Sequence, residues 1–290
     1  MSTAVYLNYT QDELDRAYDQ RVWADNATEL IAQYASASAA VRGAHAHLAD
    51  IPYGAAVEER LDWFPAAGQR RPIHVHLHGG AWRALDKSDV AFAAPAFTAS
   101  GVHFVAPGFT NLPALRLPDL IGQLIRAMIY LYRNAERLGG DPDRIFISGH
   151  SSGAHLCAVL LGLDWTTHGM PADVIKGGIC VAGIYDLEPV LLSSRRNYVH
   201  LTPEEMLRLS PARDPQQIRC PLVIAHGGKE SPEFVRQATS FADALERAGN
   251  PPRRIVMEAM NHFEIAQELG RPGSPIHDAA LAQITGAEQR

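Results

Sequence analysis

The sequence predicts an α/β fold in which helices flank a mostly parallel central sheet. Two observations lead to this prediction. Beyond Pro52, short apolar runs bounded by glycine or proline alternate with longer stretches of helical periodicity. Short apolar runs of this kind are typical of strands that are buried on both faces of a parallel sheet. The chain can also form a large core, since 47% of its 290 residues are hydrophobic.

The expected elements follow one another as strand and helix, which is the order of an α/β layer fold. Strands are expected at Val57–Phe64, Ile73–Leu77, Val102–Ala106, Ile145–Ile147, Gly178–Val181, Leu222–Ala225 and Ile255–Glu258. Helices are expected at Lys87–Ser100, Leu115–Leu138, Gly153–Leu163, Pro232–Ala248 and Ile276–Ala287.

Two segments fall outside this alternation. Residues 1–50 precede the first expected strand, and from Gln11 to about His47 apolar side chains recur at helical spacing. We expect a helical arm there, which either packs on the body or forms part of a lid over the site. Residues 186–219 lack a clear strand and are expected to form a short cap-like insertion. Because no repeat or linker interrupts the chain, residues 1–290 are expected to form a single domain.

The composition argues against several classes of protein. The net charge is −6 and like charges form no run, so a basic surface for nucleic acid is not expected. Cys157, Cys180 and Cys220 lack metal-type spacing, which argues against a disulfide framework or a cysteine zinc site. Neither a secretory signal nor a membrane-length apolar run is recognisable, so a cytoplasmic protein is expected.

A candidate nucleophile lies between an expected strand and an expected helix. The segment Gly149–Gly153 reads Gly-His-Ser-Ser-Gly, the G-x-S-x-G pattern of a strained strand-to-helix turn that projects its serine from the sheet. We expect Ser151 to be the nucleophile. The N–H of the next residue, Ser152, begins the helix and would point at developing negative charge.

A glycine loop supplies further candidate donors for an oxyanion. The segment His78–Trp82 reads His-Gly-Gly-Ala-Trp and follows an expected strand, as the glycine loops of esterases do. Its glycines allow backbone N–H groups to turn toward a substrate oxygen. We expect Gly79, Gly80 and Ser152 to form the oxyanion hole.

A row of histidines offers an alternative reading, a metal site. Among the 13 histidines of the chain, His74, His76 and His78 alternate along one expected strand and share one of its faces. No further zinc-ligand pattern follows them, and a serine elbow would be redundant in a zinc hydrolase. We therefore expect no metal, with His74 and His76 in the core and His78 holding the glycine loop through hydrogen bonds.

The acid and the base are expected after the nucleophile, in that order. Glu230 follows the strand at Leu222–Ala225, and His262 follows the last strand, so both would lie where the carboxyl ends of parallel strands meet. Glu233 competes for the role of acid, but its position inside a helix favours a salt bridge or an exposed face. A second His-Gly-Gly, at residues 226–228, is expected to be a turn.

With these residues placed, the chain resembles the arylformamidase (kynurenine formamidase) group of α/β hydrolases, near the hormone-sensitive-lipase-like esterases. Three positions depart from the usual pattern: Ala81 stands where an aromatic residue is usual, Glu230 where aspartate is frequent, and Ser152 where alanine is common. Glu230 leaves the triad intact, whereas Ala81 reshapes the mouth of the pocket. The resemblance covers nearly the whole chain and is carried by Leu14–Tyr18, Ile51–Gly54, His78–Trp82, Gly149–His155, Gly183–Pro189, Leu209–Pro211, Glu230–Phe234 and Asn261–Phe263.

The resemblance implies an α/β-hydrolase fold and a metal-independent serine hydrolase that needs no cofactor. The enzyme would cleave an aryl formamide, or a related aromatic amide or ester, through an acyl-enzyme intermediate. Trp82, Ala81, Tyr185 and Tyr198 are the expected pocket residues. Two alternatives stay open: a general carboxylesterase or other aromatic amide hydrolase, and a non-catalytic ligand-binding relative. The expected partner is the small-molecule substrate, and a homo-oligomer is left open.

Overall fold

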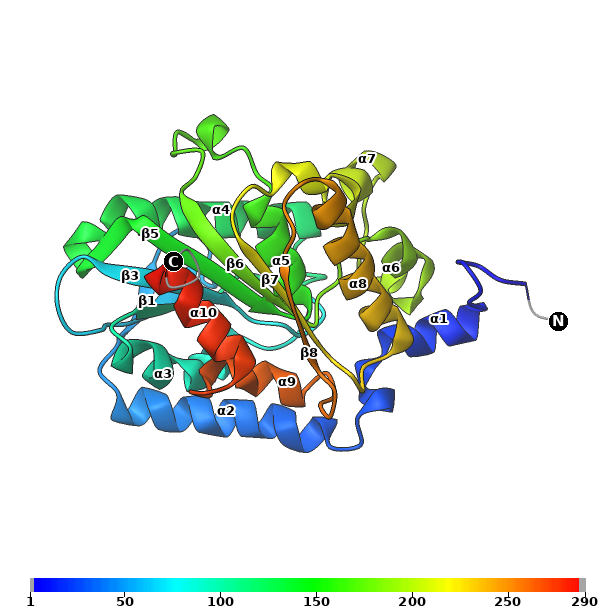
Figure 1. Cartoon of the computed structure of the whole chain (residues 1–290), viewed down its shortest axis with the longest axis horizontal. Coiled ribbons are helices and arrows are strands. Elements are labelled where there is room, and N and C mark those ends of the chain that lie inside the picture. The colour runs from blue at the N-terminus through cyan, green and yellow to red at the C-terminus, as the bar shows by residue number, and fades with distance from the viewer. Residues whose placement is uncertain (1–2, 287–290) are drawn as a thin grey trace.

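The computed structural model describes residues 3–286 and contains an eight-stranded sheet (Figure 1). The strand order is β1-β2-β4-β3-β5-β6-β7-β8. The six strands from β4 to β8 in this order run parallel, whereas β2 is antiparallel to both β1 and β4. The strands are β1 (Leu48–Pro52), β2 (Arg60–Phe64), β3 (Arg71–Leu77), β4 (His103–Pro107), β5 (Gly140–His150), β6 (Ile175–Val181), β7 (Leu222–Gly227) and β8 (Arg253–Met257).

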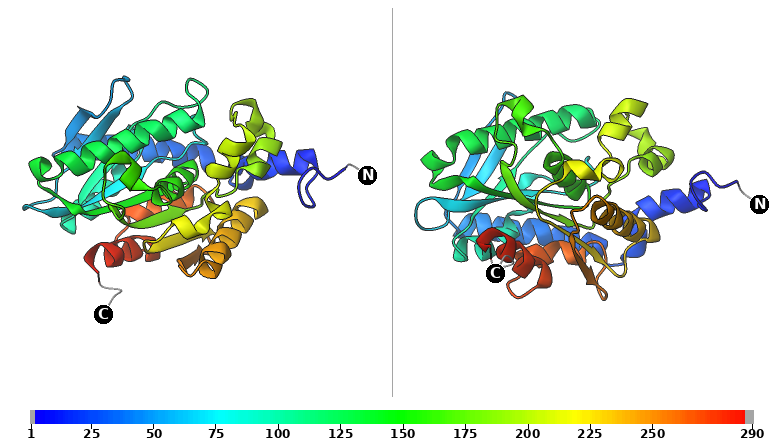
Figure 2. Two further views of the ribbon diagram at one scale, coloured as in Figure 1. Left: turned by 90° about the horizontal axis from the view of Figure 1, so that it is seen from above. Right: turned by 45° about the horizontal axis from the view of Figure 1, so that its top comes forward.

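Helices cover both faces of this sheet (Figure 2). On one face lie α4, α5 and α8, and on the other lie α3, α9 and α10, with α2 along the outside of α3 (Figure 1). The helices are α1 (Gln11–Tyr18), α2 (Ala27–Ala44), α3 (Ala94–Ala99), α4 (Leu117–Asn134), α5 (Ser152–Leu161), α6 (Glu188–Leu192), α7 (Pro203–Arg208), α8 (Pro232–Arg247), α9 (Glu264–Gln267) and α10 (Pro275–Thr285).

The central strand β3 shows why the parallel strands of the sheet appear in the sequence as runs of apolar residues. Ile73, Val75 and Leu77 belong to the core that α4, α5 and α8 cover. The alternate side chains point to the other face, where the His74 ring stacks on Phe97 of α3 at 4.2 Å between centroids. Both faces of β3 are therefore buried, and the strand has no solvated side that would produce a polar alternation.

The structure confirms the predicted fold class and places a strand at each predicted strand segment. The first of these, β2, begins only at Arg60, because Val57 lies in the preceding turn and is 77% exposed. The edge strand β1 was not predicted. Its residues are mostly exposed, and Asp50 has a φ of 55°, so no apolar alternation marks this strand in the sequence.

The predicted helix Lys87–Ser100 is wrong, because the segment is divided into two short 3₁₀ turns and α3. Lys87 is buried in the interior, where its Nζ lies 2.7 Å from Asp62 Oδ1. Pro95 lies in the first turn of α3, a position where proline favours the start of a separate helix. At the other end of the chain, α10 stops at Thr285, where Gly286 adopts a φ of 70°. Ala287, the predicted last residue of that helix, lies outside the described residues.

The predicted helical arm consists of α1 and α2, joined by a short 3₁₀ turn. α1 packs against α6 and α8 (Figure 1), where the Ser231 hydroxyl donates a hydrogen bond to the carbonyl of Ala17 at 2.7 Å. α2 is fastened to the sheet by an ion pair between Arg42 and Asp62. The role of the arm as a lid stays a prediction, as does the single domain.

Residues 186–219 contain α6, α7 and short 3₁₀ turns, and no strand.

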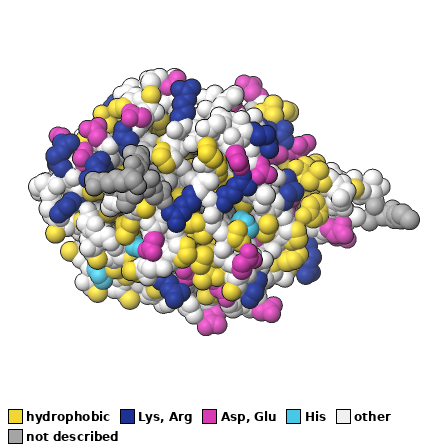
Figure 3. Space-filling view, in the orientation of Figure 1, with side chains coloured by type: hydrophobic (Ala, Val, Ile, Leu, Met, Phe, Trp, Pro, Cys, Tyr) yellow, Lys and Arg dark blue, Asp and Glu magenta, His cyan; other side chains and the backbone are white. Residues whose placement is uncertain are grey.

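Acidic and basic side chains are interspersed on the face shown in Figure 3. Within residues 3–286, no helix is both long and apolar enough to cross a membrane.

Candidate active site

The G-x-S-x-G segment forms a sharp turn between β5 and α5. Ser151 has a φ of 56° and a ψ of −121°, a strained conformation for a residue with a side chain. A Cβ on Gly149 would lie 2.1 Å from the carbonyl oxygen of Gly153, and one on Gly153 would lie 2.2 Å from that of Leu77. Gly149 is therefore required for the turn to close on itself, and Gly153 for the turn to pack against the end of β3 and the start of the glycine loop.

The structure brings Ser151, His262 and Glu230 together in one chain of hydrogen bonds. The distance from Ser151 Oγ to His262 Nε2 is 2.9 Å, and the distance from His262 Nδ1 to Glu230 Oε2 is also 2.9 Å. The second carboxylate oxygen, Glu230 Oε1, accepts the N–H of Gly227 at 2.7 Å. This is the order of nucleophile, base and acid that a serine triad requires.

Close packing between two loops fixes the base next to the acid. A Cβ on Gly227 would lie 2.3 Å from the carbonyl oxygen of Met260, so the loop after β7 touches the loop after β8 directly. The Lys229 N–H donates to the same carbonyl at 3.0 Å. His150, next to the nucleophile, lies with its Nε2 2.8 Å from the carbonyl oxygen of His262. These contacts hold the imidazole at the carboxyl end of the sheet.

Burial determines the protonation states at the site. Burial lowers the pKa of His262, and the positive charge of Arg195 lowers it further. The imidazole is therefore neutral at neutral pH and can accept the proton of Ser151. Burial raises the pKa of the Glu230 carboxyl, while the N–H of Gly227 opposes this increase.

The glycine loop presents backbone donors beside Ser151. Gly80, Ala81 and Trp82 have φ values of 99°, 54° and 60°, so three successive residues are left-handed. Among the described residues, none accepts a hydrogen bond from the N–H of Gly79, Gly80 or Ser152. The Trp82 N–H donates to Ser152 Oγ at 3.1 Å and joins the loop to the elbow. The Ser152 hydroxyl is thereby occupied, and its N–H stays free for a substrate oxygen.

Among the four predicted pocket residues, Tyr185 requires a correction. Its ring is fully buried and stacks on Phe241 at 4.3 Å between centroids, so it belongs to the core. The indole of Trp82 is also fully buried and donates to His155 Nδ1 at 3.3 Å. Ala81 and Tyr198 are half-buried, and the Arg83 guanidinium lies 4.6 Å from the centre of the Tyr198 ring.

The histidines of β3 and its following loop have structural partners. His74 Nε2 and His76 Nδ1 each lie 2.7 Å from Ser148 Oγ. His78 Nδ1 lies 2.9 Å from the carbonyl oxygen of Gly79, and its ring stacks on Phe109 at 4.1 Å. Over residues 3–286, no group of three or more His, Cys, Asp or Glu side chains is arranged to hold a metal ion.

Two charged residues near the triad are buried. Of the two roles expected for Glu233, the structure shows the salt bridge and not the exposed face: the side chain is fully buried, pairs with Arg236 at 2.7 Å and accepts the Tyr18 hydroxyl at 3.1 Å. Arg195, which sequence reasoning missed, is buried beside the triad. No pattern in the sequence separates it from the exposed Arg196 that follows.

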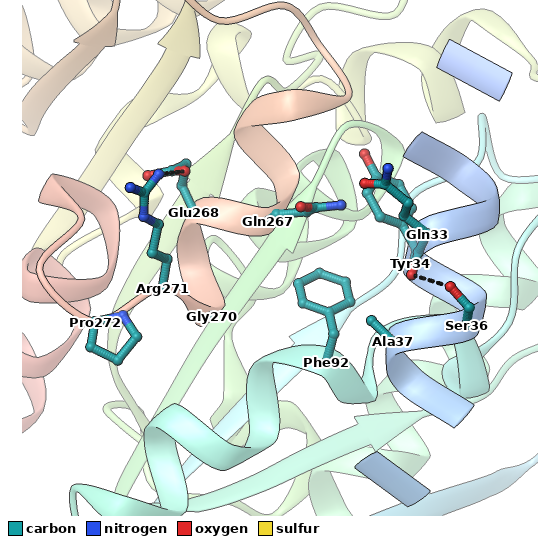
Figure 4. A pocket seen from close by; sticks show the side chains of 10 residues that line it. All are labelled: Gln33, Tyr34, Ser36, Ala37, Phe92, Gln267, Glu268, Gly270, Arg271 and Pro272. Carbon is teal, nitrogen blue, oxygen red and sulfur yellow. Dashed lines mark hydrogen bonds and ion pairs between the residues drawn. The ribbon is translucent and has the colours of Figure 1, made fainter. Parts of the chain in front are cut away.

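Two cavities lie elsewhere in the molecule. One of 690 Å³ lies between α2 and the turn after α9, where Tyr34, Phe92 and Arg271 are among its lining residues (Figure 4). Another of 510 Å³ has Asp164, Trp165 and Cys220 in its wall. Neither is lined by Ser151, His262 or Glu230.

Comparisons with known proteins identify related families, relatives and a similar solved structure. The chain matches the family BD-FAE over residues 62–179 and the prolyl oligopeptidase family over residues 124–275. It is 31% identical to kynurenine formamidase of Danio rerio and 30% identical to that of Salmo salar, in each case over 91% of this chain and 93% of the relative. A solved structure from Silicibacter sp. TM1040 superposes with a TM-score of 0.82 at 24% identity, covering 94% of this chain and 99% of the other.

Proposed function

Because the chain belongs to the kynurenine formamidase family of α/β hydrolases, we propose that it cleaves an aryl formamide, or a related aromatic amide or ester, with Ser151 as nucleophile. The chain is a hydrolase, as its formamidase and esterase relatives are. The observation that carries the proposal is the continuous hydrogen-bonded chain from Ser151 through His262 to Glu230, with both links at 2.9 Å.

In the proposed mechanism, Ser151 Oγ attacks the carbonyl carbon while His262 Nε2 takes the hydroxyl proton. The carbonyl oxygen becomes an oxyanion, which the N–H groups of Gly79, Gly80 and Ser152 stabilise. The imidazolium then gives its proton to the departing aryl amine, which leaves an acyl-serine ester. Water, deprotonated by His262, hydrolyses this ester and releases the acid. Glu230 holds the imidazole in the tautomer that these steps require.

Lengthening the acyl group of an anilide from formyl to butyryl is expected to lower kcat/KM by roughly 100-fold. The reason is the tight enclosure of the nucleophile, since Ser151 is only 5% exposed and a Cβ on Gly79 would lie 3.3 Å from the Ser151 Cβ. Steady-state rates along the formyl, acetyl, propionyl and butyryl series measure this effect. Equal rates along the series would contradict a formamidase and favour a carboxylesterase.

Gly80→Ala is expected to lower kcat by roughly 100-fold or more, the usual effect of losing an oxyanion donor. A Cβ at this position would lie 2.0 Å from the carbonyl oxygen of Ala84, so the loop must shift and carry its N–H groups away from Ser151. Gly249→Ala is the matched control, because Gly249 also has a positive φ, 86°, but open space around it. A kcat for Gly80→Ala equal to that of the control would remove the glycine loop from the mechanism.

A further inference from the structure

The residue that follows the acid of the triad is held by the N-terminal arm. Ser231 is fully buried, and its hydroxyl donates to the carbonyl of Ala17 near the end of α1 at 2.7 Å. Gln20, which begins the 3₁₀ turn after α1, binds the same serine twice. Its Nε2 donates to Ser231 Oγ at 2.9 Å, and its Oε1 accepts the Ser231 N–H at 3.4 Å. The arm therefore holds residue 231 through both its side chain and its backbone.

A second contact joins the arm to the base. The Tyr18 hydroxyl donates to Glu233 Oε1 at 3.1 Å, and the Tyr18 ring packs edge-on against Phe234 at 5.9 Å between centroids. The Phe234 ring in turn packs edge-on against the imidazole of His262 at 5.0 Å. The end of α1 and the turn after it therefore contact the neighbours of both the acid and the base.

These contacts are buried. The Gln20 side chain and the Tyr18 ring are both enclosed, as is the hydroxyl of Ser231 that the amide binds. Hydrogen bonds from which water is excluded are stronger than the same bonds at the surface. Lifting the arm would also expose the rings of Tyr18 and Phe234 to water, which is unfavourable. The arm is therefore fixed on the loop that carries the acid.

The acid itself lies between two points at which its loop is held. On one side, the N–H of Lys229 donates to the loop after β8 at 3.0 Å. On the other side, Pro232 begins α8 without an N–H, so the chain is held there through Ser231. The Glu230 carboxylate orients His262 over a single hydrogen bond of 2.9 Å. Small displacements of an orienting group are costly to the rate, so the support at residue 231 bears on catalysis.

We propose that Gln20 is a positioning residue of the triad, which holds Ser231 and thereby keeps the Glu230 carboxylate in place to orient His262. Gln20 acts through the acid and takes no part in the bond changes. The arm is then a fixed support of the active site and not a lid over it. This inference rests on the proposed function, because it requires that Glu230 serve the base that activates Ser151.

A double-mutant cycle with the acid tests the role of Gln20. Gln20→Met keeps the approximate length of the side chain but cannot bind Ser231, and it is expected to lower kcat for formanilide by roughly 10- to 30-fold with little change in KM. In a Glu230→Gln background the same substitution should lower kcat by less than about twofold, because the group through which it acts is already lost. Gln33→Met is the matched control, since Gln33 is an exposed glutamine of the arm and should change kcat in neither background.

A structural role gives a different result in this cycle. An equal loss of kcat in both backgrounds would mean that Gln20 only stabilises the fold, and an unchanged kcat in Gln20→Met would mean that the support is not needed. Either result overturns the inference. Thermal denaturation verifies folding. If Gln20→Met does not fold, Ser231→Ala removes the hydroxyl that Gln20 binds, and it should show the same dependence on Glu230.

The rate at which a fluorophosphonate labels Ser151 measures the same cycle without a carboxyl substrate. Gln20→Met should slow this labelling as it slows kcat, because the activation of the serine depends on the base and its acid. A wild-type protein that is labelled but hydrolyses no formamide overturns the proposed substrate class alone, and the labelling rates then decide the role of Gln20. A wild-type protein that is not labelled overturns both.

Discussion

Ser151→Ala is expected to lower kcat for an aryl formamide by roughly 10⁴- to 10⁶-fold, with little change in KM. The substitution removes the atom that forms the acyl-enzyme, and the oxyanion donors alone supply only a small part of the rate enhancement. Alanine fits this site without a new clash, so the fold should be retained. Steady-state kinetics with formanilide measure the effect, and thermal denaturation shows that the variant is folded.

The neighbouring hydroxyl provides the control. Ser152 Oγ accepts the N–H of Trp82 at 3.1 Å, and only the backbone N–H of this residue is assigned to the oxyanion hole. Ser152→Ala should therefore lower kcat by only about tenfold, the effect of losing one hydrogen bond in a supporting position. A loss at position 152 as large as that at position 151 would mean that the nucleophile has been assigned to the wrong serine.

Acidification from pH 7.5 to pH 5 is expected to remove most of the stability of the fold. Several buried histidines have pKa values far below the ordinary 6.5: burial lowers the pKa of His74, His150 and His262 to about 3 and that of His155 to about 4. Burial also lowers the pKa of His76. These side chains stay neutral in the folded protein, while the same residues in the unfolded chain bind protons.

The sign of the effect follows from this difference. Above pH 6.5 neither state binds a proton at these positions, so their contribution to stability is constant. Below pH 6.5 these histidines become protonated in the unfolded chain but stay neutral in the folded protein. By pH 5 each of them therefore lowers the free energy of unfolding by roughly 2 kcal/mol. Five such groups together approach the roughly 5–15 kcal/mol that stabilises a typical domain. Burial raises the pKa of Glu230 to about 7, which acts in the opposite direction, but this is one group against several.

Urea denaturation between pH 7.5 and pH 5 measures this loss. His74→Phe should reduce the proton uptake on unfolding by about one, because phenylalanine keeps the stacking on Phe97 without a titratable group. His200→Gln is the control and should leave the pH profile unchanged, since His200 is exposed. A denaturation midpoint that does not change over this pH range would show that the histidines are not held neutral by burial.

The order of the fold could be predicted because each parallel strand carries its own signal. β3, β5, β6 and β7 are buried on both faces, so each appears as an apolar run, and residues that follow such runs meet at one edge of the sheet. This reasoning selects Ser151 after β5 and Glu230 after β7, whereas His262 follows the more exposed edge strand β8 and is selected by its place after the last strand. The structure brings the three together. Sequence patterns are sufficient to place a residue when its position depends only on its type and on its distance from the end of a strand.

The features that could not be predicted depend on contacts between distant segments. Lys87 interrupts an expected helix because Asp62, on another element, draws its ammonium group inward. Tyr185 was assigned to the pocket, but Phe241 holds its ring in the core. Arg195 and Arg196 are identical in type and adjacent in sequence, and only the rings of Tyr18, Trp82 and Phe234 make one of them buried and the other exposed.

The most direct test of the central claim, that Ser151 is the activated nucleophile, is its reaction with a fluorophosphonate. We expect intact-mass spectrometry of the wild-type protein to show one adduct per chain, and peptide mapping to place it on Ser151. His262→Ala should react much more slowly, because the base that activates the hydroxyl is lost, and Ser151→Ala should not react at all. A wild-type protein that stays unlabelled, or a label on Ser152 or any other residue, would contradict the claim.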